Sequence, residues 1–263
     1  MNQDLRSLKH RSARPRLSVK LQTVIVSLVL AFAESAQSTD TEVVASIMRS
    51  QYGSGFNSKH QCWTHKSTGW GLYCMKPINI HRIDAHGVPR LYVLAEGVPM
   101  NLAGELEETG AHAAPGVVGA FLVSLDGTGK FTVLAATKEL HFGSFGAASA
   151  GDAKFLKVGA SDYYGWTFFS GGMWMGTIVT WHHIVAPRGT QFVDLSAIPE
   201  TSEDDQDHTY EIAFDTTQLD RKFFPLLVTK RFTGEGKRFG PAKVTFRVAF
   251  NTETGRYQLR KGE

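Results

Sequence analysis

The stretch 155–187 most constrains what this chain can fold into, because it concentrates large aromatic residues between glycines. Aromatic and β-branched residues favour a pleated, half-buried surface, and glycine adopts the positive backbone angles that tight turns need. The combination predicts strands joined by short turns, at the centre of a β-rich core. The aromatic residues are Tyr163, Tyr164, Trp166, Phe168, Phe169, Trp174 and Trp181.

A strand over 163–169 would have two unlike faces, since successive side chains point to opposite sides of a sheet. Tyr164, Trp166 and Phe168 would share one face, which then carries only large rings. Three adjacent rings are costly to leave in water, so we expect this face to be buried. The opposite face, which includes Phe169, is expected to be more exposed.

The rest of the chain predicts a mainly β fold, an antiparallel sheet or sandwich with one short N-terminal amphipathic helix. Thr39 and Glu42 form a capping-box pattern before apolar residues at helical spacing, which predicts a helix over 39–52. Apolar runs at 117–125 and 130–138 flank an Asp-Gly turn and predict a hairpin. Further strands are expected at 90–96, 192–195, 210–214, 223–232, 244–250 and 257–259.

Residues 1–33 have the order of a signal peptide: a basic region, an apolar run over 21–33, and small residues at Ala31 and Ala33. The run is shorter than the roughly 20 residues that a bilayer-spanning helix needs. We expect cleavage after Ala33, which leaves a single β-rich domain over 34–263 in the periplasm or secreted, and not an integral membrane protein. The alternative is an uncleaved inner-membrane anchor formed by residues 21–33.

Removing this segment changes the charge of the chain. It takes away six of the 28 Lys and Arg residues and one of the 25 Asp and Glu residues, which leaves 22 against 24 and a net charge of −2. Nucleic-acid binding requires a basic surface, so no nucleic-acid partner is expected for the mature chain.

Cys62 and Cys74 are the two cysteines of the chain, and a Gly-containing segment separates them. In an oxidising compartment such a pair predicts a structural disulfide that closes a hairpin or loop, worth about 3 kcal/mol. The alternative is metal ligation together with His60 or His65. A redox role would need a C-x-x-C pair, which the sequence lacks.

Motifs of enzymatic chemistry are missing. Ser144 is not in a G-x-S-x-G elbow, because Phe142 occupies the position of the first glycine. No phosphate-binding or dinucleotide-binding fingerprint occurs and no histidine spacing matches a metal motif, so neither a cofactor nor a metal site is predicted. An alternative function is a metal-dependent or His/Asp-based hydrolase, which requires histidines to converge with Asp152, Asp162 or Asp194 in the fold.

Five motifs follow one another between Gly116 and Thr229: VVGAFLVSLDGTGKFTVLAA, HFGSFG, FLKVGASDYYGWTFF, IVAP and FDTTQLDRKFFPLLVT. In this order they resemble an uncharacterised group of exported bacterial β-rich proteins, over about half of the mature chain. The resemblance implies export and a β fold. It implies no activity, because the group has no assigned reaction, ligand or catalytic residue.

The favoured function is a non-enzymatic exported domain that binds an envelope glycan or a protein partner through an aromatic-rich surface. Trp166, Trp174 and Trp181 are the candidate binding residues, because indole rings stack on sugars and anchor protein interfaces. The structural alternative is that each tryptophan belongs to the core. A third function is an envelope immunity or inhibitor-like protein, which acts through surface shape alone.

Overall fold

The computed structural model describes residues 40–108, 110–126, 130–174, 177–201, 207–234 and 242–260. It separates into two compact units, Met1–Glu42 and Val43–Glu263. Within the first unit residues 40–42 are helical, and all strands belong to the second. The expected signal peptide at 1–33 and its alternative, an anchor at 21–33, lie outside the described residues. Among the described residues no helix has the length and apolar character needed to span a membrane.

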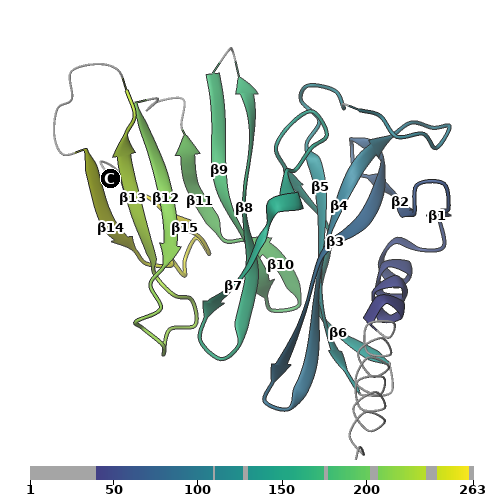
Figure 1. Cartoon of the computed structure of the whole chain (residues 1–263), viewed down its shortest axis with the longest axis horizontal. Helices are drawn as coiled ribbons and strands as arrows, with labels where there is room; N and C mark the ends of the chain where they lie inside the picture. The colour runs from purple at the N-terminus through teal and green to yellow at the C-terminus, as the bar shows by residue number, and fades with distance from the viewer. Residues whose placement is uncertain are drawn as a thin grey trace, which may run out of the picture. The chain divides into compact units, whose positions relative to one another are not determined.

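The mainly β prediction is confirmed, and the first sheet is an antiparallel meander in which each strand pairs with the next along the chain (Figure 1). The β3–β4 turn places His86 and Gly87 at positive φ. The predicted hairpin is confirmed as β5 and β6, with Leu125 opposite Phe131. The strands are β1 (Phe56–Asn57), β2 (Cys62–Ser67), β3 (Gly71–Ala85), β4 (Val88–Met100), β5 (Gly116–Leu125) and β6 (Phe131–Phe142).

The predicted helix occupies residues 40–52 and ends at Gly53, whose φ of 84° suits a glycine after a helix. Its apolar residues, including Ile47 and Met48, are buried in one cluster with side chains of the first sheet. Gly119 of β5 makes room for the last helical residue, because a Cβ there would lie 1.9 Å from the Tyr52 hydroxyl. The predicted capping residue Thr39 lies outside the described part.

The second sheet has the order β15-β11-β9-β8-β7, and β10 pairs with β9 beside it. A third sheet has the order β12-β13-β14. The strands are β7 (Lys154–Gly159), β8 (Tyr163–Trp174), β9 (Thr177–Arg188), β10 (Gln191–Asp194), β11 (Ser196–Thr201), β12 (His208–Phe214), β13 (Leu226–Phe232), β14 (Lys243–Val248) and β15 (Tyr257–Gln258). A 3-10 turn, η1 (Ala150–Asp152), precedes β7.

Alternation along the strands builds the apolar clusters. On β4, Leu91 packs in the cluster with the helix, whereas its neighbour Tyr92 packs in a second cluster with Trp166 of β8. On β9, Val185 belongs to that second cluster and Ile184 to a third cluster with β13 of the third sheet. The inner part of the second sheet is therefore apolar on both faces, which is why its strands are rich in continuous apolar runs.

Candidate functional site

The two faces of the aromatic strand β8 differ as alternation predicts only at Phe168 and Phe169, since Tyr164 is half-buried and Gly165 on the opposite face is buried. Trp166 and Phe168 are buried at 0% and 5% exposure, whereas Phe169 is 56% exposed. The Trp166 indole Nε1 donates a hydrogen bond to Asn79 Oδ1 at 3.0 Å, which satisfies the one polar atom of the side chain. Trp166 is therefore a core residue and does not belong to any binding surface, which corrects its inclusion among the candidate binding residues.

The other two candidate tryptophans have different positions. Trp181 of β9 lies opposite Ser170 of β8 and is 39% exposed. Cross-strand partners share a face, so Trp181 lies on the same side of the sheet as Phe168. Trp174 is the last residue of β8, and its side chain lies outside the described part of the structure. The three tryptophans thus do not form one described surface.

An exposed apolar surface occurs instead on the opposite face of the β8–β9 pair. Phe169, Met173 and Ile178 are 56%, 47% and 57% exposed, and we call these three residues the hairpin strip. Met173 pairs directly with Ile178, and Phe169 shares their face because it is four residues before Met173. The alternation along β8 predicts the exposure of Phe169, whereas no pattern in the sequence marks Met173 or Ile178.

The backbone beside the hairpin strip also lacks a neighbouring strand. β7 pairs with β8 only from Tyr163 to Thr167. Among the described strands, none pairs with the outer edge of β8 beyond that point, where β8 pairs only with β9. One backbone carbonyl on this segment, that of Gly171, accepts a hydrogen bond of 3.4 Å from the Ser144 hydroxyl.

Of the histidine and aspartate residues proposed for hydrolysis, the structure joins His183 and Asp194. The His183 Nδ1 atom lies 2.9 Å from Asp194 Oδ2. The other carboxylate oxygen of Asp194 accepts hydrogen bonds from the backbone amides of Ile184 and Ser196 at 3.0 and 3.1 Å. Asp194 therefore holds the connection between β10 and β11, and in the described part of the chain no hydroxyl or thiol bonds to His183.

The other two aspartates of that set do not form a buried site with histidine. Asp152 is exposed in η1, and Asp162 makes ion pairs of 3.6 Å with His86 and Lys157. Within the described ranges, no three His, Cys, Asp or Glu side chains are arranged to hold a metal ion.

A polar cluster that sequence analysis missed is centred on Glu139 of β6. Glu139 Oε2 lies 2.9 Å from His65 Nε2, and Glu139 Oε1 lies 2.6 Å from His141 Nε2. The Ser67 hydroxyl and the Thr68 amide also donate to Oε1. No local motif marks this cluster, because its members come from β2 and β6, more than 70 positions apart in the chain.

The electrostatics of Glu139 show what the cluster does. Partial burial would raise its pKa, but the hydrogen bonds from Ser67, His65, His141 and the Thr68 amide outweigh burial and lower the pKa to about 2. A carboxylate with this pKa does not accept a proton near neutral pH, and its oxygens are already occupied. We therefore assign Glu139 a structural role. Its hydrogen bonds connect β2 and β6, which lie toward opposite ends of the strand order in the first sheet.

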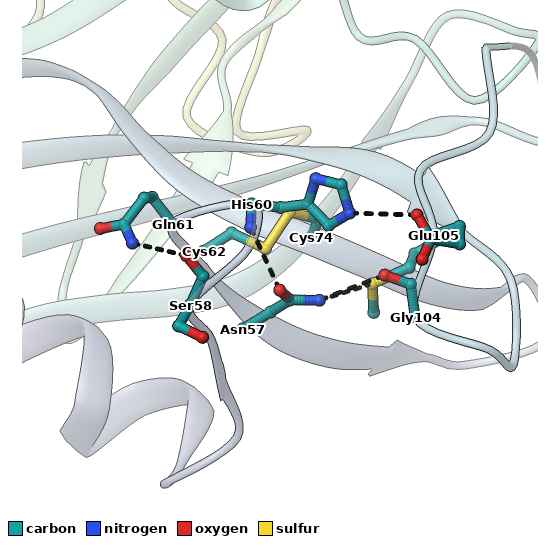
Figure 2. The surroundings of a disulfide bond; sticks show 9 residues. Asn57, Ser58, His60, Gln61, Cys62, Cys74, Gly104 and Glu105 are labelled. Atoms are coloured by element: carbon teal, nitrogen blue, oxygen red, sulfur yellow. Dashed lines mark hydrogen bonds and ion pairs between the residues drawn. A yellow bond between two sulfur atoms is a disulfide. The ribbon is translucent and has the colours of Figure 1, made fainter.

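The predicted disulfide is confirmed: Cys62 of β2 is bonded to Cys74 of β3, with 5.4 Å between their Cα atoms. Figure 2 shows the His60 ring directed toward Glu105, with 3.6 Å between His60 Nε2 and Glu105 Oε2. His65 is engaged by Glu139, as described above. The cysteines are thus bonded to each other, and the alternative of a metal site with His60 or His65 is wrong.

No protein-family model, curated protein or solved structure matches this chain. The resemblance to an exported β-rich group therefore stays a prediction.

Proposed function

We propose that this protein is a non-enzymatic exported domain that binds a protein partner at the outer end of the β8–β9 hairpin. The observation that carries the proposal is the hairpin strip, Phe169, Met173 and Ile178, which exposes three large apolar side chains on one face. Exposed apolar residues that share one face of a strand pair are typical of interaction sites.

The geometry favours a protein over a glycan. Stacking on a sugar needs flat rings that are presented together, but Phe169 and Trp181 lie on opposite faces of the strand pair. Two of the three strip residues, Met173 and Ile178, are not aromatic. Beyond Gly171, whose carbonyl is bonded by Ser144, the outer edge of β8 can also accept an added strand from a partner, whose alternate side chains would then cover Met173 and Ile178.

An enzymatic function has weaker support. Among the residues that the structure describes, no nucleophile bonds to the His183–Asp194 pair, and Glu139 is held in its ionised form by four donors. An immunity or inhibitor-like role is a special case of the proposal, because it requires the same kind of protein partner.

Site-specific photo-crosslinking tests the proposal in cells. A benzophenone amino acid at Ile178 is expected to give one discrete higher-mass adduct, because the side chain would lie inside the interface. The matched control places the same group at Leu219, which is 73% exposed but lies outside the strip.

Two outcomes would contradict the proposal. The first is equal labelling from positions 178 and 219, or labelling from neither. The second is binding of the purified protein to cell-wall glycan that Trp181→Ala abolishes and Phe169→Ser leaves intact, which would replace the protein partner by a glycan.

A further inference from the structure

A basic cavity lies apart from the hairpin strip, at the ends of β9 and β14 and the connection between β12 and β13. Its volume is about 510 Å³, within the usual range of small-molecule sites. Four cationic side chains, two phenylalanine rings and several small or polar residues line it. The cations are Arg188, Arg221, Lys222 and Arg247, and the rings are Phe223 and Phe250.

Most of this positive charge is not neutralised. Arg247 forms an ion pair with the buried carboxylate of Asp215. Within the described residues, no carboxylate lies at ion-pair distance from Arg188, Arg221 or Lys222. These three cations, all exposed to solvent, leave a local positive charge at the cavity, which would attract an anion. The predicted mature chain has a net charge of −2, so the positive charge at this cavity is a local feature and not a property of the whole chain.

The cavity is held in shape by its surroundings. Asp215 accepts hydrogen bonds from the Thr217 amide and hydroxyl at 3.1 and 2.6 Å, which anchors the start of the connection. The Ala160 amide donates to the Arg221 carbonyl at 2.9 Å and ties the same connection to the end of β7. Gly255 lets the Arg188 guanidinium approach closely, because a Cβ there would lie 2.0 Å from Nη1. A preformed site loses less free energy in ordering when a ligand binds.

The two phenylalanine rings indicate that a ligand of this cavity has an apolar part as well as an anionic group. The centroids of Phe223 and Phe250 lie 4.1 Å apart, and Lys222 Nζ lies 5.7 Å from the Phe223 centroid. The rings offer an apolar wall beside the cations, whereas guanidinium groups match the oxygens of phosphate in a two-point geometry. An inorganic ion would leave this apolar wall uncovered.

We propose that this cavity binds an organic phosphate, whose phosphate group is held by Arg188, Arg221 and Lys222 and whose apolar part lies against Phe223 and Phe250. Such a group can come from a soluble phosphate ester or from a phospholipid headgroup. This site does not depend on the hairpin strip, and binding can be measured on the purified protein without any partner.

Isothermal titration of the purified mature protein with phenyl phosphate tests the proposal. We expect one site per chain, with weaker binding of inorganic phosphate and no binding of phenol. The double variant Arg221→Gln/Lys222→Gln should weaken binding at least about tenfold, since a hydrogen bond to a charged group is worth about 1.5–3 kcal/mol. Lys130→Gln/Lys138→Gln removes the same charge at exposed positions elsewhere and should change affinity less than about twofold.

Sedimentation with phosphatidylglycerol vesicles separates the two sources. Vesicle binding that phenyl phosphate competes away indicates a headgroup, and phenyl phosphate binding without vesicle binding indicates a soluble ester. The proposal is overturned if neither probe binds, if inorganic phosphate binds as tightly as phenyl phosphate, or if both double variants weaken binding equally. Equal melting temperatures of the variants exclude misfolding as the cause.

Discussion

The first sheet and the second sheet differ in how far their outer strands are held by other parts of the chain. In the first sheet, side chains of β2 and β6 meet through Glu139, and the Cys62–Cys74 bond ties β2 to β3. In the second sheet, β8 is buried between two apolar clusters at Trp166, whereas Met173 is 47% exposed and no described strand pairs with the outer edge of β8 beside it. Proteins normally protect strand edges, and this difference between the two sheets is the basis of the proposed partner site.

The largest effect is expected inside the second sheet. Trp166→Ala should destabilise the protein by about 3–5 kcal/mol, the usual cost of emptying a buried aromatic site. Phe169→Ala, three residues along the same strand but exposed, should change the free energy of unfolding by less than about 1 kcal/mol. Denaturant unfolding of both variants measures the contrast. An unchanged melting transition in Trp166→Ala would mean that the inner half of β8 is not core.

The disulfide should have the next largest effect. The double variant Cys62→Ser/Cys74→Ser is expected to lose about 3 kcal/mol, because the unfolded chain gains the freedom that the bond removes. Urea unfolding measures the loss, and thiol labelling of the native, unreduced protein should find neither cysteine. Labelling of both cysteines would show that the first sheet is not covalently tied in the isolated protein.

Glu139→Gln should cost about 2 kcal/mol at neutral pH, because it leaves His65, Ser67 and His141 without their charged partner. Glu105→Gln is the matched control, since Glu105 pairs with Lys59 at an exposed position and should cost little. Chemical denaturation of both variants compares the loss of unfolding free energy at the Glu139 cluster with the loss at an exposed surface ion pair. Equal losses would show that Glu139 is not a special tie.

The pH dependence of the Glu139 effect has a definite sign. The pKa of Glu139 is lowered from 4.5 to about 2 in the folded protein, so its ionised form stabilises the fold at all pH values above 4.5. This contribution is lost as the pH falls from 4.5 toward 2. The stability difference between the natural protein and Glu139→Gln should therefore shrink over that interval, and a difference that stays constant would contradict the assignment.

The smallest effect on stability is expected at the hairpin strip. Ile178→Ser should leave the melting temperature nearly unchanged, because the side chain is 57% exposed. It should nevertheless reduce crosslinking from a benzophenone placed at Phe169, whereas Leu219→Ser should not. A large drop in stability would mean that the hairpin strip packs against other parts of the protein and is not exposed to a partner.

Local features of this fold could be predicted because each depends on residues that are neighbours in the chain. The helix, the β5–β6 hairpin and the contrast between Phe168 and Phe169 on β8 follow from periods of 3.6 and 2 and from turn residues. Boundaries were less accurate: the strand expected at 223–232 begins at Leu226, because the Phe224 amide bonds to the Val158 carbonyl of β7 and not to a strand of the third sheet. The sequence pattern predicts strands only from residue 80 onward and does not predict that β3 begins at Gly71.

The sequence by itself determined the β class, the disulfide partners and the alternation that buries Trp166. Tertiary structure alone decided that Glu139 contacts two histidines, that His183 contacts Asp194, and that β8 extends beyond the end of its neighbour β7. It also decided that cations from three separate segments surround one cavity. The physical reason is that periodicity fixes which way a side chain points, whereas sheet order and register fix what it meets.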